Sequence, residues 1–209
     1  MSLTLLLNTA NEHKKREMQD IARPHTLRTK DEFTLSGEFE ETGSTFLENA
    51  LGKAQTLADE LTKEQFHAYA IDAVIADDSG VCVSALDGAP GIYSARFGQP
   101  REGRKLTSAE QNDLLLEKMR NATDRSAYYT CCMVAILADG RVVSVEDRLY
   151  GEIATRPSRG GGGFGYDPVF FLPDRGVCVA DLSDEEKHRI SHRGKATRAL
   201  LSALGSMLR

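Results

Sequence analysis

The chain has 209 residues, a formal net charge of −5 and a hydrophobic content of 41%. This length and composition are typical of a folded globular protein and argue against a disordered chain. The negative charge argues against nucleic-acid binding through a broad basic face, so any phosphate site should be local. No apolar run approaches the roughly 18 residues of a membrane span, and the first residues lack the basic start of a signal peptide. We therefore expect a cytoplasmic protein with no membrane or nucleic-acid partner.

The first predicted elements alternate between strand and helix. Residues 3–7 form an apolar run of strand length, and residues 12–21 have the pattern of a charged amphipathic helix. A capping box from Thr45 to Glu48 predicts a second helix that continues to about residue 61. Residues 74–76 predict the next strand, which we expect to end in a polar Asp-Asp-Ser-Gly segment.

The rest of the chain predicts further helices and one hairpin. A helix should begin near residue 107 or 108, and a capping box at residues 183–186 opens another. Residues 128–137 and 142–153 flank an Asp-Gly dipeptide, which is typical of a tight β-turn. A C-terminal helix is expected from residue 196 to residue 208. Because helices and strands mix without repeats or linkers, we expect a single α/β domain over residues 1–209 with a mixed sheet.

The cysteines have no metal-binding spacing. Cys82, Cys131, Cys132 and Cys178 contain no Cys-x-x-Cys pair, and the two adjacent residues lie in an apolar segment with the pattern of a buried strand. We expect reduced core residues, with metal ligation or redox chemistry as the minority alternative.

A glycine-rich run at residues 160–163 is the most distinctive segment of the chain, and it is followed by Phe164, Gly165, Tyr166 and Asp167. Glycine has no Cβ, so the N–H groups of such a loop can approach a ligand closely. The ring of Phe164 can stack on a planar base. The segment favours a nucleotide site, although composition alone would favour a mobile linker.

Polar residues follow two of the predicted strands. Thr9, Asn11 and Lys14 lie between a strand end and a helix N-terminus, where amide donors and the helix dipole attract phosphate. The alternative is that Asn11 is an N-cap and Lys14 part of a solvated face. The side chains of Asp77 and Asp78 should point to opposite faces of the strand, so only one carboxylate should enter a given cleft. That carboxylate would act in the chemistry, and the other would have an orienting role. Carboxylate oxygens are preferred ligands of Mg²⁺, but an ordinary turn would have the same residues.

Three further features have two interpretations each. Glu48 fits both a capping box and a metal ligand at a helix start, and its spacing does not decide between them. Lys53 on the same helix either reaches solvent or contacts a phosphate. Lys187 and the segment from Ser191 to Lys195 form a dense cluster of donors, which is also typical of a cationic helix C-terminus with its cap.

Six motifs occur in an order that resembles the inosine triphosphate pyrophosphatase family, whose members hydrolyse deaminated purine nucleoside triphosphates. The motifs are Thr9-x-Asn11-x-x-Lys14, Thr42-Gly-x-Thr-Phe-x-Glu48-Asn49-Ala50-x-x-Lys53-Ala54, Ala76-Asp-Asp78-Ser-Gly80, Gly88-Ala-Pro-Gly-Ile-Tyr-Ser-Ala-Arg96, Gly163-Phe-Gly-Tyr-Asp-Pro168 and Ser191-His-Arg-Gly-Lys195. They cover nearly the whole chain. The family usually has Gly at the position of Ala10 and often at that of His13.

The resemblance implies an elongated mixed β-sheet flanked by helices, with two lobes, a central substrate cleft and a homodimeric assembly. It also implies Mg²⁺-dependent cleavage between the α- and β-phosphates of a purine nucleoside triphosphate, which yields a monophosphate and pyrophosphate.

The resemblance also implies roles for individual residues. The residues that match the family's triphosphate contacts are Thr9, Asn11, Lys14 and Lys53. Glu48 and Asp78 match the metal site, Asp78 also matches the proton acceptor, and Ser79 matches a substrate contact. The residues that match the base-binding set, in which Phe164 stacks and the cationic donors reach the purine O6, are Phe164, Gly165, Tyr166, Asp167, Lys187, His192 and Arg193.

Two other functions remain as alternatives. A non-catalytic nucleotide sensor would keep the pocket and lose turnover, but both Asp78 and Glu48 are intact. A Maf-like pyrophosphatase would act on modified pyrimidine nucleotides. The purine-sized Phe164 loop and the donor cluster at residues 191–193 do not suit such a substrate. The chain has no Gly-x-x-x-x-Gly-Lys-Ser/Thr motif, which argues against a P-loop NTPase.

Overall fold

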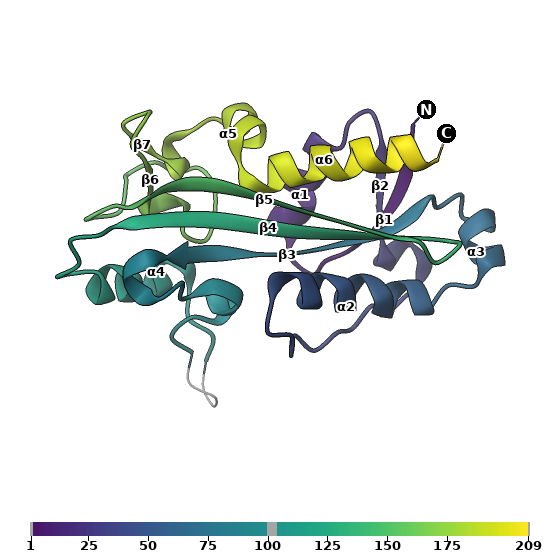
Figure 1. The fold of residues 1–209 in the computed structure, drawn as a ribbon, viewed down its shortest axis with the longest axis horizontal. Helices are drawn as coiled ribbons and strands as arrows, with labels where there is room; N and C mark the ends of the chain where they lie inside the picture. The colour runs from purple at the N-terminus through teal and green to yellow at the C-terminus, as the bar shows by residue number, and fades with distance from the viewer. Residues whose placement is uncertain (1, 100–103, 209) are drawn as a thin grey trace. The chain divides into compact units, whose positions relative to one another are not determined.

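A computed structural model describes residues 2–99 and 104–208. Within these residues the strands form one seven-stranded mixed sheet in the order β2-β1-β3-β4-β5-β6-β7 (Figure 1). The strands are β1 (Thr4–Asn8), β2 (Thr26–Thr29), β3 (Ala73–Val83), β4 (Ser126–Leu137), β5 (Val142–Ile153), β6 (Phe170–Leu172) and β7 (Val177–Cys178). β1 pairs in parallel with β2 and β3, whereas β6 pairs antiparallel with β5 and β7. The prediction of an α/β fold with a mixed sheet is confirmed.

Side-chain caps define where several of the helices begin. The helices are α1 (Glu12–Ile21), α2 (Phe46–Asp59), α3 (Lys63–Ala68), α4 (Ser108–Lys118), α5 (Asp184–Ile190) and α6 (His192–Met207). The predicted capping boxes that begin at Thr45 and Ser183 are both present, and Thr107 forms a third with Glu110. None of the helices in the described residues is long and apolar enough to cross a membrane.

The chain folds into two compact units. Unit 1 comprises Met1–Asp78, Cys131–Asp147 and Arg193–Arg209, and unit 2 comprises Ser79–Thr130 and Arg148–His192. The long strands β3, β4 and β5 each contribute residues to both units.

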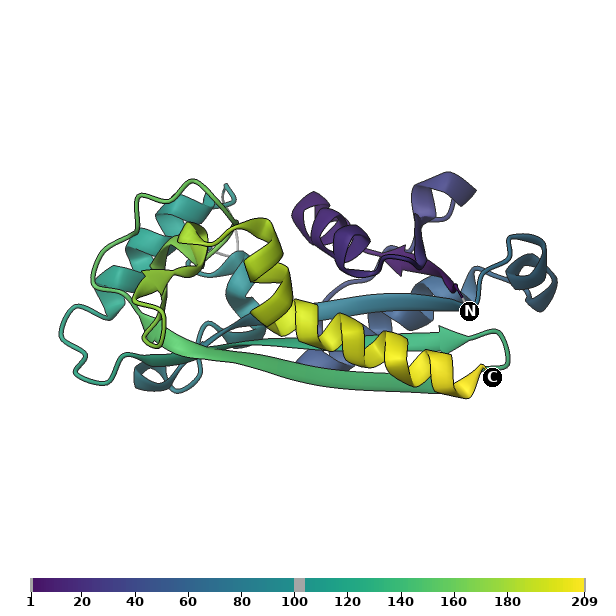
Figure 2. The ribbon, with the colours of Figure 1, turned by 90° about the horizontal axis from the view of Figure 1, so that it is seen from above.

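Unit 1 has a separate hydrophobic core on each face of its strands. Leu5 and Ile75 pack with residues of α1 and α6, whereas Leu6 and Val74 pack with residues of α2 and α3. Figures 1 and 2 show α2 and α6 on opposite faces of these strands. Because side chains alternate along a strand, the odd-numbered residues of β3 from Ala73 to Asp77 face α1 and α6, and the even-numbered residues from Val74 to Asp78 face α2.

Unit 2 has a core of its own around Phe170, whose side chain is fully buried. The ring of Tyr129 stacks on Phe170 with 4.3 Å between ring centroids, and Leu115 of α4 belongs to the same cluster. This core underlies the segment after the glycine-rich run, because Tyr166 and Val169 are also part of it.

The structure corrects two predicted boundaries. β3 does not end at Ala76 but continues through the polar Asp-Asp-Ser-Gly segment to Val83. The two carboxylates remain inside the strand because both are held by partners on neighbouring elements, as described below. α6 begins at His192, four residues before the predicted start, and Gly194 does not interrupt it.

Four short elements were not predicted from the sequence. β2, α3, β6 and β7 have 4, 6, 3 and 2 residues. Such segments are too short for a periodic pattern of apolar residues to develop.

All four cysteines are buried and form no disulfide. Burial raises the pKa of the Cys132 thiol to about 11, and burial raises that of Cys131 still further. Both thiols are therefore protonated at neutral pH and supply no thiolate to a metal ion. The prediction of reduced core cysteines is confirmed.

Candidate active site

The connection between β1 and α1 is held by its own side chains. Oδ1 of Asn11 accepts hydrogen bonds from the backbone N–H groups of His13 and Lys14 at 3.0 and 3.2 Å, and Oγ1 of Thr9 accepts one from the Asn11 N–H at 3.2 Å. The interpretation of Asn11 as an N-cap is confirmed. Ala10 does not adopt a positive φ, so its side chain introduces no strain of that kind into the loop.

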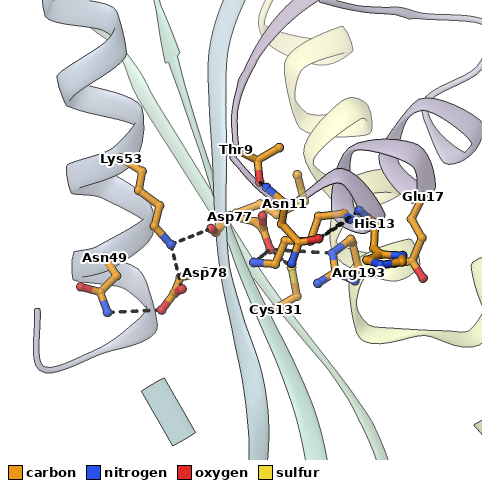
Figure 3. Close-up of polar contacts among 12 residues, drawn as sticks. Thr9, Asn11, His13, Glu17, Asn49, Lys53, Asp77, Asp78, Cys131 and Arg193 are labelled. Carbon is orange, nitrogen blue, oxygen red and sulfur yellow. Dashed lines mark hydrogen bonds and ion pairs between the residues drawn. The ribbon is translucent and has the colours of Figure 1, made fainter. Parts of the chain in front are cut away.

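Lys14 belongs to a buried group of charges on the α1 and α6 side of β3. Figure 3 shows Glu17, Asp77 and Arg193 of this group. Nζ of Lys14 donates to Oδ2 of Asp77 at 2.8 Å, and only 15% of the lysine side chain is exposed. The same carboxylate oxygen lies 3.7 Å from Nε of Arg193 and 3.9 Å from Sγ of Cys131. Nη1 of Arg193 donates to Oε2 of Glu17 at 2.6 Å. Lys14 is therefore not part of a solvated helix face.

Asp77 and Arg193 both stay ionised in this group, although both are buried. Burial opposes ionisation of Asp77, but Lys14, Arg193 and Lys53 outweigh it and hold the pKa of this carboxyl well below its usual range. Burial likewise disfavours the charge on Arg193, yet Asp77 and Glu17 raise the pKa of its guanidinium above the usual value. Asp77 and Arg193 form a charged pair at neutral pH.

Asp78 points the opposite way, toward α2 (Figure 3). Its Oδ1 accepts from Nζ of Lys53 at 2.9 Å and its Oδ2 from Nδ2 of Asn49 at 3.3 Å. Lys53 also pairs with Glu41, and its side chain is 16% exposed. Burial raises the pKa of Asp78 above its usual value, although Lys53 acts against this. A buried carboxylate with a raised pKa beside a cation is typical of a general base.

Glu48 caps α2 in this structure. Its Oε2 accepts from the backbone N–H groups of Ser44 and Thr45 at 2.6 and 3.2 Å. The hydroxyl and the backbone N–H of Ser44 lower the pKa of Glu48, so this exposed side chain is ionised at neutral pH. The capping interpretation is confirmed, and the role of Glu48 as a metal ligand stays a prediction.

Asp78 and Glu48 are the two carboxylates predicted to hold Mg²⁺. Among residues 2–99 and 104–208, no group of three or more His, Cys, Asp or Glu side chains is arranged to hold a metal ion. Asp78 and Glu48 offer carboxylate oxygens, and Mg²⁺ often takes only one or two of these, with water and phosphate oxygens as its other ligands. The residues present therefore fit Mg²⁺ that binds together with a phosphate-bearing substrate.

The glycine-rich run in unit 2 packs against the protein itself. Gly163 has φ of +71°, and a Cβ at this position would lie 2.3 Å from Oδ2 of Asp167. A Cβ at Gly160 would lie 2.5 Å from the carbonyl oxygen of Ala180, whereas one at Gly161 would meet open space. Close packing within the protein thus explains why residues 160 and 163 are glycines. That a ligand closely approaches this loop stays a prediction.

Asp167 joins several of the predicted base-binding residues. The residue is 4% exposed, and its carboxylate accepts from Nζ of Lys187 at 2.6 Å, the backbone N–H of Phe164 at 2.8 Å and the hydroxyl of Tyr129 at 3.2 Å. Nζ of Lys187 also lies 4.6 Å from the ring centroid of Phe164. The structure therefore brings Phe164, Asp167 and Lys187 into one cluster within unit 2.

The other predicted residues of unit 2 are held in different ways. His192 stacks on Tyr129 with 4.6 Å between ring centroids. Tyr166 is 5% exposed and donates its hydroxyl to the Ser94 carbonyl at 2.8 Å, so its side chain is part of the core. The carbonyl of Gly165 accepts from Asn112 at 3.1 Å. Ser79 lies in β3 and is partly buried.

Lys187 and Arg193, which we predicted to reach the purine O6, are each bound to carboxylates of their own unit. Lys187 donates to Asp167, and Arg193 lies against Glu17 and Asp77. Their role in base recognition stays a prediction.

Sequence reasoning assigned no role to Glu17, Asn49 or Tyr129. Glu17 lies three residues after Lys14, a spacing that places both on one helix face. Asn49 stands inside one of the six motifs, but nothing in its spacing indicated a contact with Asp78. No local pattern singled out Tyr129, which contacts Asp167, Phe170 and His192, all distant from it in the sequence.

The structure is that of an α/β protein with a buried carboxylate and lysine pair, Asp78 on β3 and Lys53 on α2. Comparison with known proteins identifies its family. Residues 5–203 match the model of the Ham1 family, and the chain belongs to that family. It is 42% identical over 194 residues to the dITP/XTP pyrophosphatase of Treponema denticola, with 93% of this chain and 94% of the relative covered. It is 44% identical over 205 residues to the Thermus thermophilus protein of the same name, with 96% and 91% covered.

Solved structures agree with this assignment. A HAM1 protein from Coxiella burnetii matches with a TM-score of 0.81 and 35% identity, over 98% of this chain and 99% of that one. The Staphylococcus aureus Ham1 protein matches with a TM-score of 0.80 and 34% identity, over 99% and 100%. The family suggested by the six motifs is confirmed.

Proposed function

We propose that this protein hydrolyses deaminated purine nucleoside triphosphates, dITP/ITP and XTP/dXTP, to the monophosphate and pyrophosphate. It thereby cleanses the cytoplasmic nucleotide pool, with residues 1–209 acting as one pyrophosphatase domain. The observation that carries the proposal is the buried Asp78 carboxylate, which has a raised pKa and lies 2.9 Å from the Lys53 ammonium. The substrate class is supported by relatives named dITP/XTP pyrophosphatase that match over most of both chains.

The chemistry of phosphoanhydride hydrolysis fits these residues. The reaction requires charge neutralisation, a positioned phosphate and an oriented water more than covalent catalysis. Lys14 and Lys53 bind the triphosphate together with Thr9 and Asn11, and Asp78 takes the proton of the attacking water. Mg²⁺ held by Glu48 and Asp78 would neutralise negative charge on the phosphate oxygens when bound.

Base recognition is assigned to the residues that match the family's base-binding set. Phe164 stacks on the purine, Ser79 and residues 165–167 line the nucleoside, and Lys187, His192 and Arg193 supply donors to O6. Hypoxanthine and xanthine have a carbonyl oxygen at this position, whereas adenine has an amino group that would oppose donor to donor. The cluster of Phe164, Asp167 and Lys187 supports this assignment, because Asp167 fixes the ammonium near the aromatic ring.

Product analysis tests the proposed function directly. The protein is mixed with Mg²⁺ and dITP, and the products are separated by ion chromatography. We expect dIMP and pyrophosphate. Unchanged dITP with saturable binding would indicate a nucleotide sensor, and faster hydrolysis of modified pyrimidine triphosphates would indicate a Maf-like enzyme.

Glu48→Gln is expected to raise the Mg²⁺ concentration needed for half-maximal dITP hydrolysis. The amide oxygen retains the cap of α2, but the negative charge that would attract the metal ion is lost. The measurement is a magnesium titration of the initial rate at saturating dITP. A titration curve identical to that of the unmodified protein would reduce Glu48 to a helix cap.

Lys187→Met is expected to lower the ratio of kcat/KM for dITP to that for dATP by about 10- to 100-fold, because a hydrogen bond from a charged donor to O6 is lost. Lys187→Arg keeps the charge beside Asp167 and serves as the matched control. Kinetics with both nucleotides provide the test. Equal proportional losses on dITP and dATP would show that Lys187 does not read the base.

We also propose a homodimer, which is an implication of the family resemblance. Sedimentation analysis should give a mass twice the 22.9 kDa of the chain. A species of 22.9 kDa at every protein concentration would contradict the proposal.

A further inference from the structure

Asn49 is a fully buried polar residue next to the proposed general base. It lies on α2, directly after Glu48 and four residues before Lys53, and its side chain is 0% exposed. Nδ2 donates to Oδ2 of Asp78 at 3.3 Å, and Oδ1 accepts from the backbone N–H of Gly43 at 2.9 Å. Each end of the amide therefore has a partner, one on β3 and one in the segment that precedes α2. Figure 3 shows the contact with Asp78.

Gly43 allows this segment to pack directly on Asn49. A Cβ at Gly43 would lie 2.6 Å from Oδ1 of Asn49 and 2.8 Å from Cβ of Glu48. Both distances are shorter than real contacts of a Cβ atom. The segment before α2 thus packs closely on Asn49, whose amide is held by its hydrogen bonds with Gly43 and Asp78.

The two oxygens of Asp78 have different partners. Oδ1 accepts from the Lys53 ammonium, which is 16% exposed and also pairs with Glu41. A triphosphate that binds Lys53 competes for this ammonium. The Asn49 amide is neutral and buried, so it keeps its contact with Oδ2 when Lys53 turns to the substrate.

We propose that Asn49 is a positioning residue that fixes the carboxylate plane of Asp78 for attack by water. The terminal torsion of an aspartate has a broad energy minimum, so an unsupported carboxylate would sample many orientations. A misplaced base lowers the rate of the chemical step more than it lowers substrate affinity, because it acts on the transition state. This inference rests on the proposed function of Asp78.

A purely structural role predicts a different outcome. If Asn49 served only to satisfy the Gly43 N–H group, replacing its donor end would leave catalysis unchanged. Asn49→Asp keeps the acceptor for Gly43 and removes the N–H group that faces Asp78, but it also adds a negative charge beside Asp78. Gly43→Ala adds no charge and separates the loss of the hydrogen bond from this added repulsion. Asn49→Ala removes both contacts.

The test is steady-state dITP hydrolysis by Asn49→Ala and Asn49→Asp, with circular dichroism to verify that each variant is folded. We expect kcat to fall roughly 10- to 100-fold in both variants, the effect of losing a hydrogen bond to a charged group. KM for dITP should stay within about threefold, as for a contact that acts in the transition state. Gln111→Ala is the matched control. Gln111 is a buried amide that donates to the carbonyls of Ala95 and Phe97, and its loss should lower the melting temperature without lowering kcat.

Gly43→Ala tests the same contact without changing the amide, because the added Cβ pushes against Oδ1 of Asn49. We expect Gly43→Ala to show the same fall in kcat with little change in KM. This variant also tests the proposal if the Asn49 variants do not fold. Unchanged kcat in Asn49→Asp or in folded Gly43→Ala would overturn the proposal, as would a raised KM with unchanged kcat. If the unmodified protein releases no pyrophosphate from dITP, the proposed function itself fails.

Discussion

Asp78→Asn is expected to lower kcat for dITP hydrolysis by ~10²–10⁴-fold, the usual effect of losing a general base. The amide has the shape of the carboxylate and still accepts from Lys53, but it cannot take a proton from water at neutral pH. Nucleotide affinity should change by less than about tenfold, because the proposed triphosphate contacts of Lys14 and Lys53 remain.

The measurement combines steady-state kinetics with equilibrium binding of dITP in the absence of Mg²⁺. Asp139→Asn is a matched control, because it removes the same charge from an exposed side chain in the turn between β4 and β5. We expect this control to have near wild-type kcat. If Asp78→Asn also retained near wild-type kcat, Asp78 would not be the base.

Local sequence signals were sufficient for most of the helices and for the hairpin. Asn11, Thr45 and Thr107 each cap a helix at the expected residue, and Gly140 adopts a positive φ in the turn of the hairpin. These signals act over a few residues, so they can be read without knowledge of the tertiary fold. β2, β6 and β7 have 4, 3 and 2 residues and left no such signal, because they are defined by their pairing with β1, with β5 and with each other.

The path of β3 shows why the end of this strand was predicted wrongly. Asp77 and Asp78 are polar, so they read as the end of an apolar run, yet both are almost fully buried. Their partners Lys14 and Lys53 lie 63 and 25 residues away in the sequence. Only the tertiary fold supplies those cations. The alternation of the two carboxylates between opposite faces, in contrast, follows from strand geometry and was predicted.

Residues of the candidate site could be named from the sequence where they lie in a motif or a cluster of donors. Contacts between residues far apart in the chain could not. Phe164 and Asp167 came from one motif and Lys187 from the donor cluster that precedes another, and the structure brings the three together within unit 2. Arg193 was recognised as a donor, but its pairing with Glu17 joins residues 176 positions apart. A sequence pattern carries no information on such a pair.

The adjacent carboxylates of β3 should also differ sharply in their effect on stability. Asp77→Asn is expected to lower the free energy of unfolding at pH 7 by ~3–5 kcal/mol, because it removes one partner from a buried group of charges. Arg193 would keep Glu17, but the neutral amide would no longer balance the second positive charge on Lys14. Asp78→Asn should cost much less, since burial already favours the uncharged form of that side chain.

The pH dependence follows from the opposite directions of the two pKa shifts. Asp77 has a pKa below its unfolded value, so its contribution to stability is complete above about pH 4 and is lost as the pH falls toward the folded pKa. Asp78 has a raised pKa, so its effect runs the other way, and stability decreases as the pH rises through the folded value. Urea unfolding of both variants between pH 3 and pH 7, a range chosen to span the ordinary aspartate pKa of about 3.9, measures both effects. The stability gap between the unmodified protein and Asp77→Asn should narrow in acid. Equal losses for the two substitutions at pH 7 would show that Asp77 is not the charge that holds Lys14 and Arg193 together.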